Sequence, residues 1–157
     1  CGTITDPHTA WLLMRSLETL HIRMERSQAN AMDLVARLRG HPKIESVLDA
    51  GGAESSRGQR ALFARQCTGA GSTFSLRLRG GEAEAFRMLN ALQLFKLAVS
   101  LGGTESLVSH PSSTTHSDYS EDAKARCGIG DNLVRLSVGI ENVDDLAADL
   151  LTALQAA

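Results

Sequence analysis

The stretch LVRLSVGIENVDDL, Leu133–Leu146, contains a strand pattern followed directly by a helix start. From Leu133 to Gly139 apolar and polar residues alternate, as in a strand with one buried and one polar face, and Arg135 falls on the polar face. Asn142 is a preferred N-cap residue, and the two aspartates after it would lie beside the positive end of the helix dipole. The stretch therefore predicts a half-buried strand that leads into an amphipathic C-terminal helix. The apolar stripe of that helix comprises Val143, Leu146, Ala147, Leu150 and Leu154.

The remaining elements follow from the same kinds of pattern. A second alternating strand is expected at Ser72–Arg79, and less regular strands at Lys43–Leu48, Leu94–Leu101 and Glu105–Val108. Helices are expected after Asp6-Pro7, over the periodic stretch that stops at Gly40 and Pro42, at Glu82–Leu92 and at Ser120–Cys127. Loops are expected at Gly51-Gly52 with the following Ser-Arg-Gly, and at His110–Tyr119. This order predicts an α+β fold with a small, mostly antiparallel sheet and helices on one face.

Composition limits the class of protein. The 157 residues are enough for one packed domain, with 43% hydrophobic and 22% charged residues. A formal net charge of −2 argues against a nucleic-acid or anionic-membrane partner. Three widely spaced cysteines favour a reducing, cytoplasmic compartment over a disulfide framework. A start at Cys-Gly-Thr rather than Met leads us to expect that the beginning of the protein is missing.

Several residue groups have the types needed for chemistry but not the spacing. Ser112, His116 and Asp118 would make a hydrolytic triad, yet no G-x-S-x-G turn presents the serine. His110, His116 and Cys127 lack the paired spacing of zinc ligands. The glycines of Gly69–Gly71 precede a strand, whereas a dinucleotide fingerprint follows one. A solvated loop, isolated polar residues and turn glycines are the preferred interpretations.

Arg135 is the exception because it lies within an expected strand. Arginine is unfavourable there unless its guanidinium reaches either water or an anion, and its planar fork matches a carboxylate. From the residues alone, both water and an anion remain possible partners of the Arg135 guanidinium.

Three stretches carry a resemblance to a known family. They are FKLAVSLGGTESLVSHPSSTTH (95–116), LVRLSVGIENVDDL (133–146) and PHTAWLLMRSLETLHIRMERSQAN (7–30). Together they resemble the C-terminal part of the Cys/Met-metabolism pyridoxal-phosphate (PLP) enzymes, a family that includes cystathionine gamma-synthase, cystathionine gamma-lyase, methionine gamma-lyase and the homoserine sulfhydrylases. The resemblance implies the C-terminal domain of a fold-type I PLP enzyme. Residues 1–40 would be a helical junction segment and 41–157 the α+β substrate-recognition domain, with the large PLP-binding domain absent.

The resemblance also implies a division of labour within the active site. None of Lys43, Lys96 and Lys124 lies in the Ser-x-Thr-Lys context of the family's Schiff-base lysine, which is expected upstream. No catalytic residue and no PLP-binding residue is therefore expected here, and the chain alone should be inactive. The implied role is substrate binding, with Arg135 clamping the α-carboxylate. The other substrate-binding residues implied are Ser100, Leu101 and Thr115.

Subfamily and assembly are implied in the same way. Val99 occupies a position that is usually acidic in cystathionine-using members, and a valine cannot pair with a distal ammonium, so methionine gamma-lyase is the closest expectation. Thr114 and Gly103 depart from the lyase pattern, and the Thr-Thr-His run is similar to that of sulfhydrylases. Cystathionine gamma-synthase, cystathionine gamma-lyase and O-acetyl- or O-succinylhomoserine sulfhydrylase remain alternatives, as does a non-catalytic interaction module. A homotetramer is implied for the parent enzyme.

Overall fold

The computed structural model describes residues 2–52 and 55–157, and its centre is a five-stranded sheet. Cys1 and the middle of the loop expected after Leu48, residues 53 and 54, lie outside the described residues. In spatial order the strands are β1 (Ile44–Leu48), β2 (Thr73–Leu78), β5 (Leu133–Ser137), β4 (Leu107–Ser109) and β3 (Lys96–Leu97). Neighbouring strands are antiparallel except β3 and β4, which are parallel. The expected α+β fold with a mostly antiparallel sheet is confirmed.

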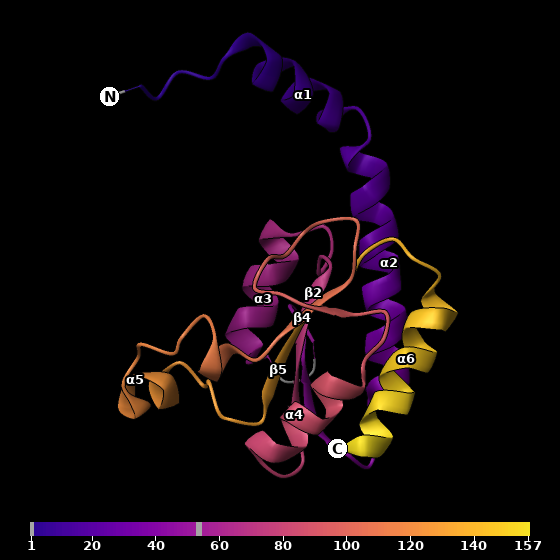
Figure 1. The fold of residues 1–157 in the computed structure, drawn as a ribbon, viewed down its shortest axis with the longest axis vertical. Coiled ribbons are helices and arrows are strands. Elements are labelled where there is room, and N and C mark those ends of the chain that lie inside the picture. The colour runs from indigo at the N-terminus through magenta and orange to yellow at the C-terminus, as the bar shows by residue number, and fades with distance from the viewer. Residues whose placement is uncertain (1, 53–54) are drawn as a thin grey trace.

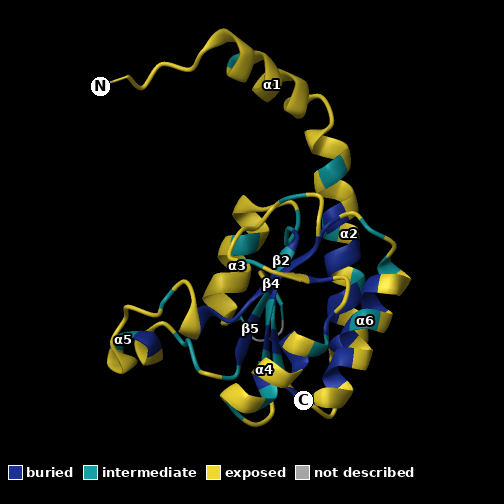
Figure 2. Cartoon of the chain, viewed as in Figure 1, coloured by how far each residue is buried: buried dark blue, intermediate teal, exposed yellow. Residues whose placement is uncertain are grey.

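Three helices cover the apolar face of the sheet. They are α2 (Leu20–Leu38), α4 (Glu82–Ala91) and α6 (Val143–Ala156), and Figure 1 shows α2 and α6 running side by side along one flank. The buried residues of these helices meet those of the strands in one cluster, which appears as the dark interior of Figure 2. The largest fully buried apolar side chains are Leu34, Leu38, Leu76, Leu78, Met88, Leu136, Leu146, Leu150 and Leu154.

The opposite face of the sheet is polar at its centre. Arg135 on β5 lies between Ser75 of β2 and Ser109 of β4 in the strand register. Residues that are directly opposed in antiparallel strands project from the same face, so these three side chains form one row. The alternation expected for Leu133–Gly139 is confirmed: Val134, Leu136 and Val138 belong to the core cluster, and Arg135 is half-buried on the other face.

Three expectations about local structure need correction. The Ser-Arg-Gly stretch is the start of a helix, α3 (Arg57–Gln66), and not part of a loop. Its described residues are all exposed or half-buried, so it shows no apolar stripe, and a capping box between Ser56 and Gln59 stabilises its first turn. The strand expected at Leu94–Leu101 is reduced to the two residues of β3, because the chain leaves the sheet after it pairs with β4. The loop expected at His110–Tyr119 begins with buried residues and a 3₁₀ turn, Pro111–Ser113.

The N-terminal arm projects from this body (Figure 1). Its helix α1 (Pro7–Leu17) begins where expected, because the Asp6 carboxylate accepts hydrogen bonds from the backbone N–H of His8 and Thr9 at 3.0 and 3.1 Å. Every residue of α1 except the half-buried Ala10 is exposed, including Trp11. The arm comprises residues 2–24, and the other large apolar side chains exposed on it are Ile4, Leu12, Leu13, Met14, Leu17, Leu20, Ile22 and Met24.

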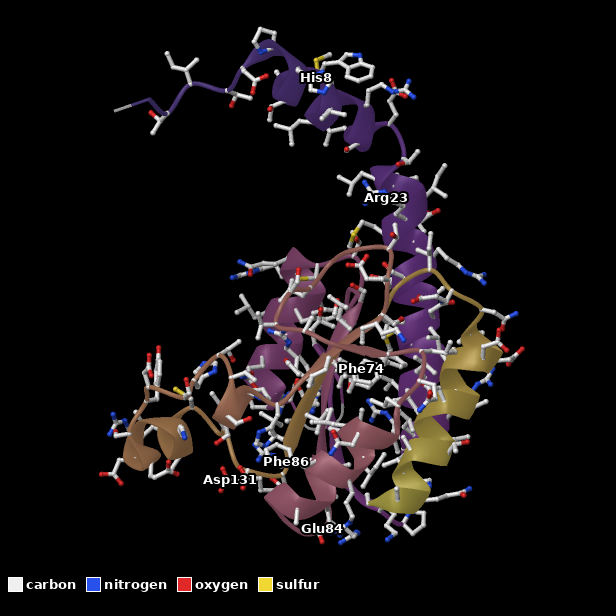
Figure 3. All side chains as sticks on the ribbon, viewed as in Figure 1. His8, Arg23, Phe74, Glu84, Phe86 and Asp131 are labelled. Carbon is white, nitrogen blue, oxygen red and sulfur yellow. The ribbon has the colours of Figure 1, made fainter. Side chains whose placement is uncertain are left out.

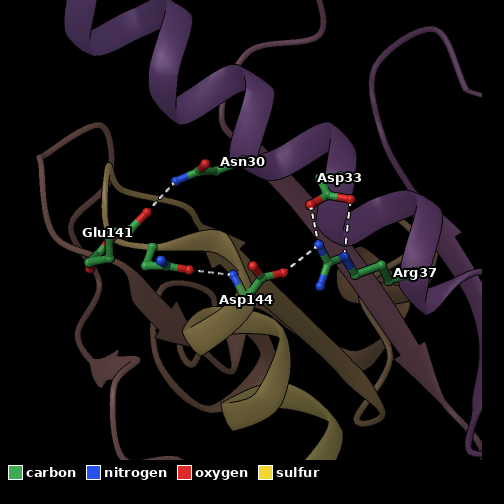
Figure 4. A network of polar contacts seen from close by, with 6 residues as sticks. Asn30, Asp33, Arg37, Glu141 and Asp144 are labelled. Carbon is green, nitrogen blue, oxygen red and sulfur yellow. Dashed lines mark hydrogen bonds and ion pairs between the residues drawn. The ribbon is translucent and has the colours of Figure 1, made fainter.

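A polar network fixes the connection between β5 and α6. The Asn30 side chain of α2 donates to the carbonyls of Gly139 and Glu141 at 3.1 and 2.8 Å. The Glu141 carboxylate in turn accepts from the backbone N–H and the hydroxyl of Ser106 at 2.7 and 2.9 Å. Figure 4 shows the bond from Asn30 to Glu141 beside the Arg37 guanidinium, which bridges α2 to the first turn of α6. The end of β5 is thus held from two sides.

Candidate functional site

Arg135 is placed at the centre of the polar face by the strand that carries it. Its guanidinium turns towards the segment that follows β3 and donates from Nη2 to the carbonyl oxygens of Val99 and Ser100, at 2.6 and 3.2 Å. The chain covers the sheet there because Gly102 N–H donates to the Ser137 hydroxyl at 2.9 Å. Backbone carbonyls therefore hold the arginine, and the side chains of the covering segment are left free.

The guanidinium charge is not neutralised by the described part of the chain. Arg15, Arg37, Arg39 and Arg87 each contact a carboxylate, whereas no ion pair among the described residues involves Arg135. A cation in a half-buried position without a counter-ion carries a desolvation cost that a bound anion would offset. Arg135 is therefore a candidate anion-binding group.

Two buried polar atoms without a hydrogen-bond partner lie at the same place. Among the described residues, the buried side-chain atoms without a partner are Ser109 Oγ and Arg135 Nε, and these two residues oppose each other in the register. Buried polar groups are nearly always hydrogen-bonded, so each exception needs an explanation. The polar face beside Arg135 is therefore the candidate binding surface of the chain.

The other residues expected at the site lie on two loops. Ser100 brings its carbonyl to Arg135, while the Val99 and Leu101 side chains are both 55% exposed. Thr114 donates its hydroxyl to the His110 carbonyl at 2.7 Å, and the Thr115 hydroxyl bonds to His116 Nδ1 at 2.8 Å. The structure therefore brings residues 99 and 100 to Arg135, whereas Thr114 and Thr115 bond within their own turn.

Ser75 and Ser109 were not found from the sequence. No signal marks Ser109, since the three residues of β4 are all buried and only the register with β5 shows which face each one occupies. Ser75 stands in the alternating strand Ser72–Arg79, so the pattern predicts its position on the polar face. The pattern does not predict that Ser75 lies opposite Arg135 in the neighbouring strand.

The lysines are all engaged away from this row. Lys43 Nζ donates to the carbonyl of Ala157, Lys96 Nζ to that of Gln93, and Lys124 Nζ to the carboxylate of Glu121, at 2.6, 2.6 and 3.0 Å. A PLP enzyme needs a lysine beside the carbon that reacts. The three lysines are therefore each engaged with a partner other than Arg135, Ser75 or Ser109.

The groups set aside at the sequence level are dispersed. Ser112 donates to Asp131, whereas the His116 ring packs edge-on to Tyr119 with ring centroids 5.0 Å apart. Within residues 2–52 and 55–157, no three His, Cys, Asp or Glu side chains gather as a metal site. No helix in the same ranges is long and apolar enough to cross a membrane.

Comparison with known proteins identifies relatives of one kind. A family described as Cys/Met metabolism PLP-dependent enzyme matches residues 1–155. L-methionine gamma-lyase of Pseudomonas putida is 46% identical and O-succinylhomoserine sulfhydrylase of Pseudomonas aeruginosa 39% identical, each match covering 99% of this chain and 38% of the relative. The solved structure of cystathione gamma lyase from Micromonospora echinospora is similar with a TM-score of 0.90 at 42% identity, covering 99% of this chain and 40% of that one. The chain thus spans less than half the length of the relatives it matches.

Proposed function

The chain belongs to the Cys/Met metabolism PLP-dependent enzyme family, and on that premise we propose that it is the substrate-recognition part of an enzyme acting on a sulfur amino acid. The observation that carries this proposal is the uncompensated guanidinium of Arg135 in the central strand. An α-carboxylate is the anion that every amino acid substrate brings, and a guanidinium binds it through charge-assisted hydrogen bonds.

The proposed role of Arg135 is to hold and orient the substrate. Its Nη2 is fixed by the carbonyls of Val99 and Ser100, so a carboxylate would meet a guanidinium of defined direction. Ser100, Leu101 and Thr115 are proposed to line the same end of the substrate. When bound, PLP supplies an electron sink for the substrate α-carbon. Fixing the carboxylate sets the direction of the Cα–H bond, which lowers the entropic part of the barrier to proton removal.

The rest of the active site is proposed to come from the remainder of the enzyme. The relatives are longer than this chain, and the family's cofactor lysine is expected in that additional length. The exposed apolar residues of the arm, such as Trp11 at 54% and Ile22 at 66% exposure, support a junction role for residues 1–40. A homotetramer and a cytoplasmic location are proposed for the whole enzyme. Both described cysteines, Cys67 and Cys127, are exposed free thiols, which suits a reducing compartment.

Within the family, we favour methionine gamma-lyase activity, the gamma-elimination that gives a thiol, 2-oxobutanoate and ammonia. Val99 has no charge to offer a distal ammonium, and its exposed side chain stands next to the carbonyl that holds Arg135. The identity to the Pseudomonas putida lyase supports the same choice. Thr114 and the identity to a sulfhydrylase keep O-succinylhomoserine sulfhydrylase activity as the second candidate.

The test is the Arg135→Ala variant of the complete protein, assayed with L-methionine. Loss of the charge-assisted hydrogen bonds to the carboxylate should raise KM about 10–100-fold, while the absorbance of bound PLP stays unchanged. Arg135→Lys keeps the charge without the fork and should recover only part of the loss. Arg79→Ala removes an exposed arginine that follows β2 and serves as the matched control. An unchanged KM in Arg135→Ala would remove the carboxylate role.

A further inference from the structure

The chain between β4 and β5 makes a long excursion from the sheet. It leaves at His110, passes through the 3₁₀ turn and the short helix α5 (Glu121–Arg126), and rejoins the sheet after Asp131. We call residues 111–130 the excursion; Figure 1 shows α5 at its outer end, away from the body. Both Thr114 and Thr115 lie on its outgoing side. The two ends of the excursion must be kept together for these threonines to keep their place relative to β5.

His110 joins the two ends. Its Nε2 lies 2.7 Å from the carbonyl oxygen of Asp131, which can only accept, so Nε2 carries the hydrogen. In the neutral ring Nδ1 then accepts from the Ser113 hydroxyl at 2.8 Å. The Ser112 hydroxyl donates to the Asp131 carboxylate at 2.7 Å, and Thr114 donates to the His110 carbonyl. We call His110, Ser112, Ser113 and Asp131 the neck clasp.

The His110 ring of the neck clasp lies on the core side of the sheet. Ser109 shares the polar face with Arg135, so the next residue, His110, faces the opposite way. Its 1% exposure and its edge-on contact with Phe86 of α4, at 5.0 Å between ring centroids, agree with that placement. Figure 3 labels Phe86 on α4 and Asp131 where the excursion rejoins the sheet. His110 thus cannot touch a substrate held by Arg135 and acts only through the residues it positions.

We propose that His110 is a positioning residue for substrate binding: it closes the neck of the excursion and thereby fixes the Thr115 turn relative to Arg135. The inference rests on the proposed function, in which both residues face the substrate. The turn itself is held by a bond from His116 N–H to the Pro111 carbonyl at 2.9 Å, so it moves as a unit when its anchor is lost. A misplacement of about 1 Å in a binding site can cost about 100-fold in rate.

The test compares three variants of the complete protein. His110→Ala removes both ring contacts, whereas His110→Gln keeps an N–H donor near the Nε2 position for the Asp131 carbonyl. The comparison variant is Arg39→Ala, which breaks the 2.6 Å ion pair with the buried Asp49 next to β1, at the opposite edge of the sheet. It lowers stability without touching the neck. Amide hydrogen exchange across residues 114–119 and the kinetics with L-methionine are measured on each.

His110→Ala should speed exchange at the His116 amide and raise KM about 10–100-fold, with kcat less affected. His110→Gln should bring both the exchange rate and KM most of the way back to their original values. Arg39→Ala should change neither the exchange rate nor KM after correction for the folded fraction. Unchanged exchange or unchanged KM in His110→Ala overturns the inference. If that variant does not fold, Ser113→Ala removes one clasp contact from an exposed residue and must shift both readouts in the same direction, or the inference fails. A wild-type protein that binds PLP but converts no amino acid refutes the proposed function instead, and hydrogen exchange then decides whether His110 holds the excursion.

Discussion

The substitution Asn30→Ala tests whether one buried side chain holds the end of β5 in place. Asn30 is 2% exposed, and its amide donates to the carbonyls of Gly139 and Glu141; Figure 4 shows the bond to Glu141. No other side chain among the described residues donates to both of these carbonyls. Alanine keeps the helix and removes both donors, so the loss should appear as a change in the free energy of unfolding.

The magnitude follows from the two hydrogen bonds. The bond to Glu141 contributes about 1 kcal/mol net, whereas the carbonyl of the buried Gly139 would be left without a donor at a cost of about 1–3 kcal/mol. The carbonyl of the half-buried Glu141 can turn partly to water, and alanine regains about 0.5 kcal/mol in helix propensity. The expected loss is therefore about 2–3 kcal/mol. With a urea m-value of about 2 kcal/mol/M, the midpoint should fall by about 1 M.

The assay is urea unfolding of the 157-residue chain followed by far-ultraviolet circular dichroism. Arg26→Ala, an exposed change on the same helix, is the control and should stay within about 0.5 kcal/mol of the original chain. Asn30→Asp supplies only acceptors opposite two carbonyls and should lose at least as much as Asn30→Ala. If Asn30→Ala matches Arg26→Ala instead, the two bonds do not stabilise the fold and the reasoning is wrong.

Two further predictions use the same unfolding assay. In Gly139→Ala the new Cβ would lie 2.2 Å from the Thr104 carbonyl oxygen, so the free energy of unfolding should fall by more than about 3 kcal/mol. The control is Gly58→Ala, in open space on α3, which should raise the free energy of unfolding by about 0.5–1 kcal/mol. Equal effects of the two changes would contradict the close contact at Gly139. The Gly81 N–H donates to Glu84 and holds its pKa below the ordinary 4.5, so this carboxylate stabilises the fold above that value and loses its effect as the pH falls through the lowered pKa. The midpoint difference between Glu84→Ala and the original chain should therefore be present at about pH 7 and vanish in acid, and a difference that persists in acid would exclude the charge as its cause.

The sequence predicted the elements whose signals are local. The strand and helix of Leu133–Leu146 are correct because alternation and an N-cap act over a few residues, and Asn142 does accept from Asp144 N–H at 2.8 Å. The helix α3 was missed because it lacks an apolar stripe, although its capping box, Ser56 with Gln59, is a local signal that could have indicated it. The length of β3 depends on how far β4 runs beside it, which no local pattern contains.

The candidate site likewise contains features that local patterns predicted and features that they did not. The polar side of β5 was predictable for Arg135, since it needs only the strand period. The carbonyls that hold the guanidinium, and the unpartnered hydroxyl of Ser109, depend on contacts between segments more than 25 residues apart. His110 was expected in a polar loop, but its burial follows from the face it occupies at the end of β4. Each of these features depends on how segments distant in the sequence are aligned in the fold.

The way Arg135 is held bears on how a family of one fold serves several substrates. Val99 contributes its carbonyl to the guanidinium, and any residue at that position would contribute the same atom. Its side chain, 55% exposed, is not needed for that bond. The side chain at position 99 can therefore change without loss of the bond that holds the guanidinium. With Arg135 in its proposed role as carboxylate anchor, the backbone holds the anchor and the side chain at position 99 is left to select the substrate. Under the proposed function, recognition of the carboxylate that all amino acids share is in this way separated from recognition of the side chain that distinguishes them.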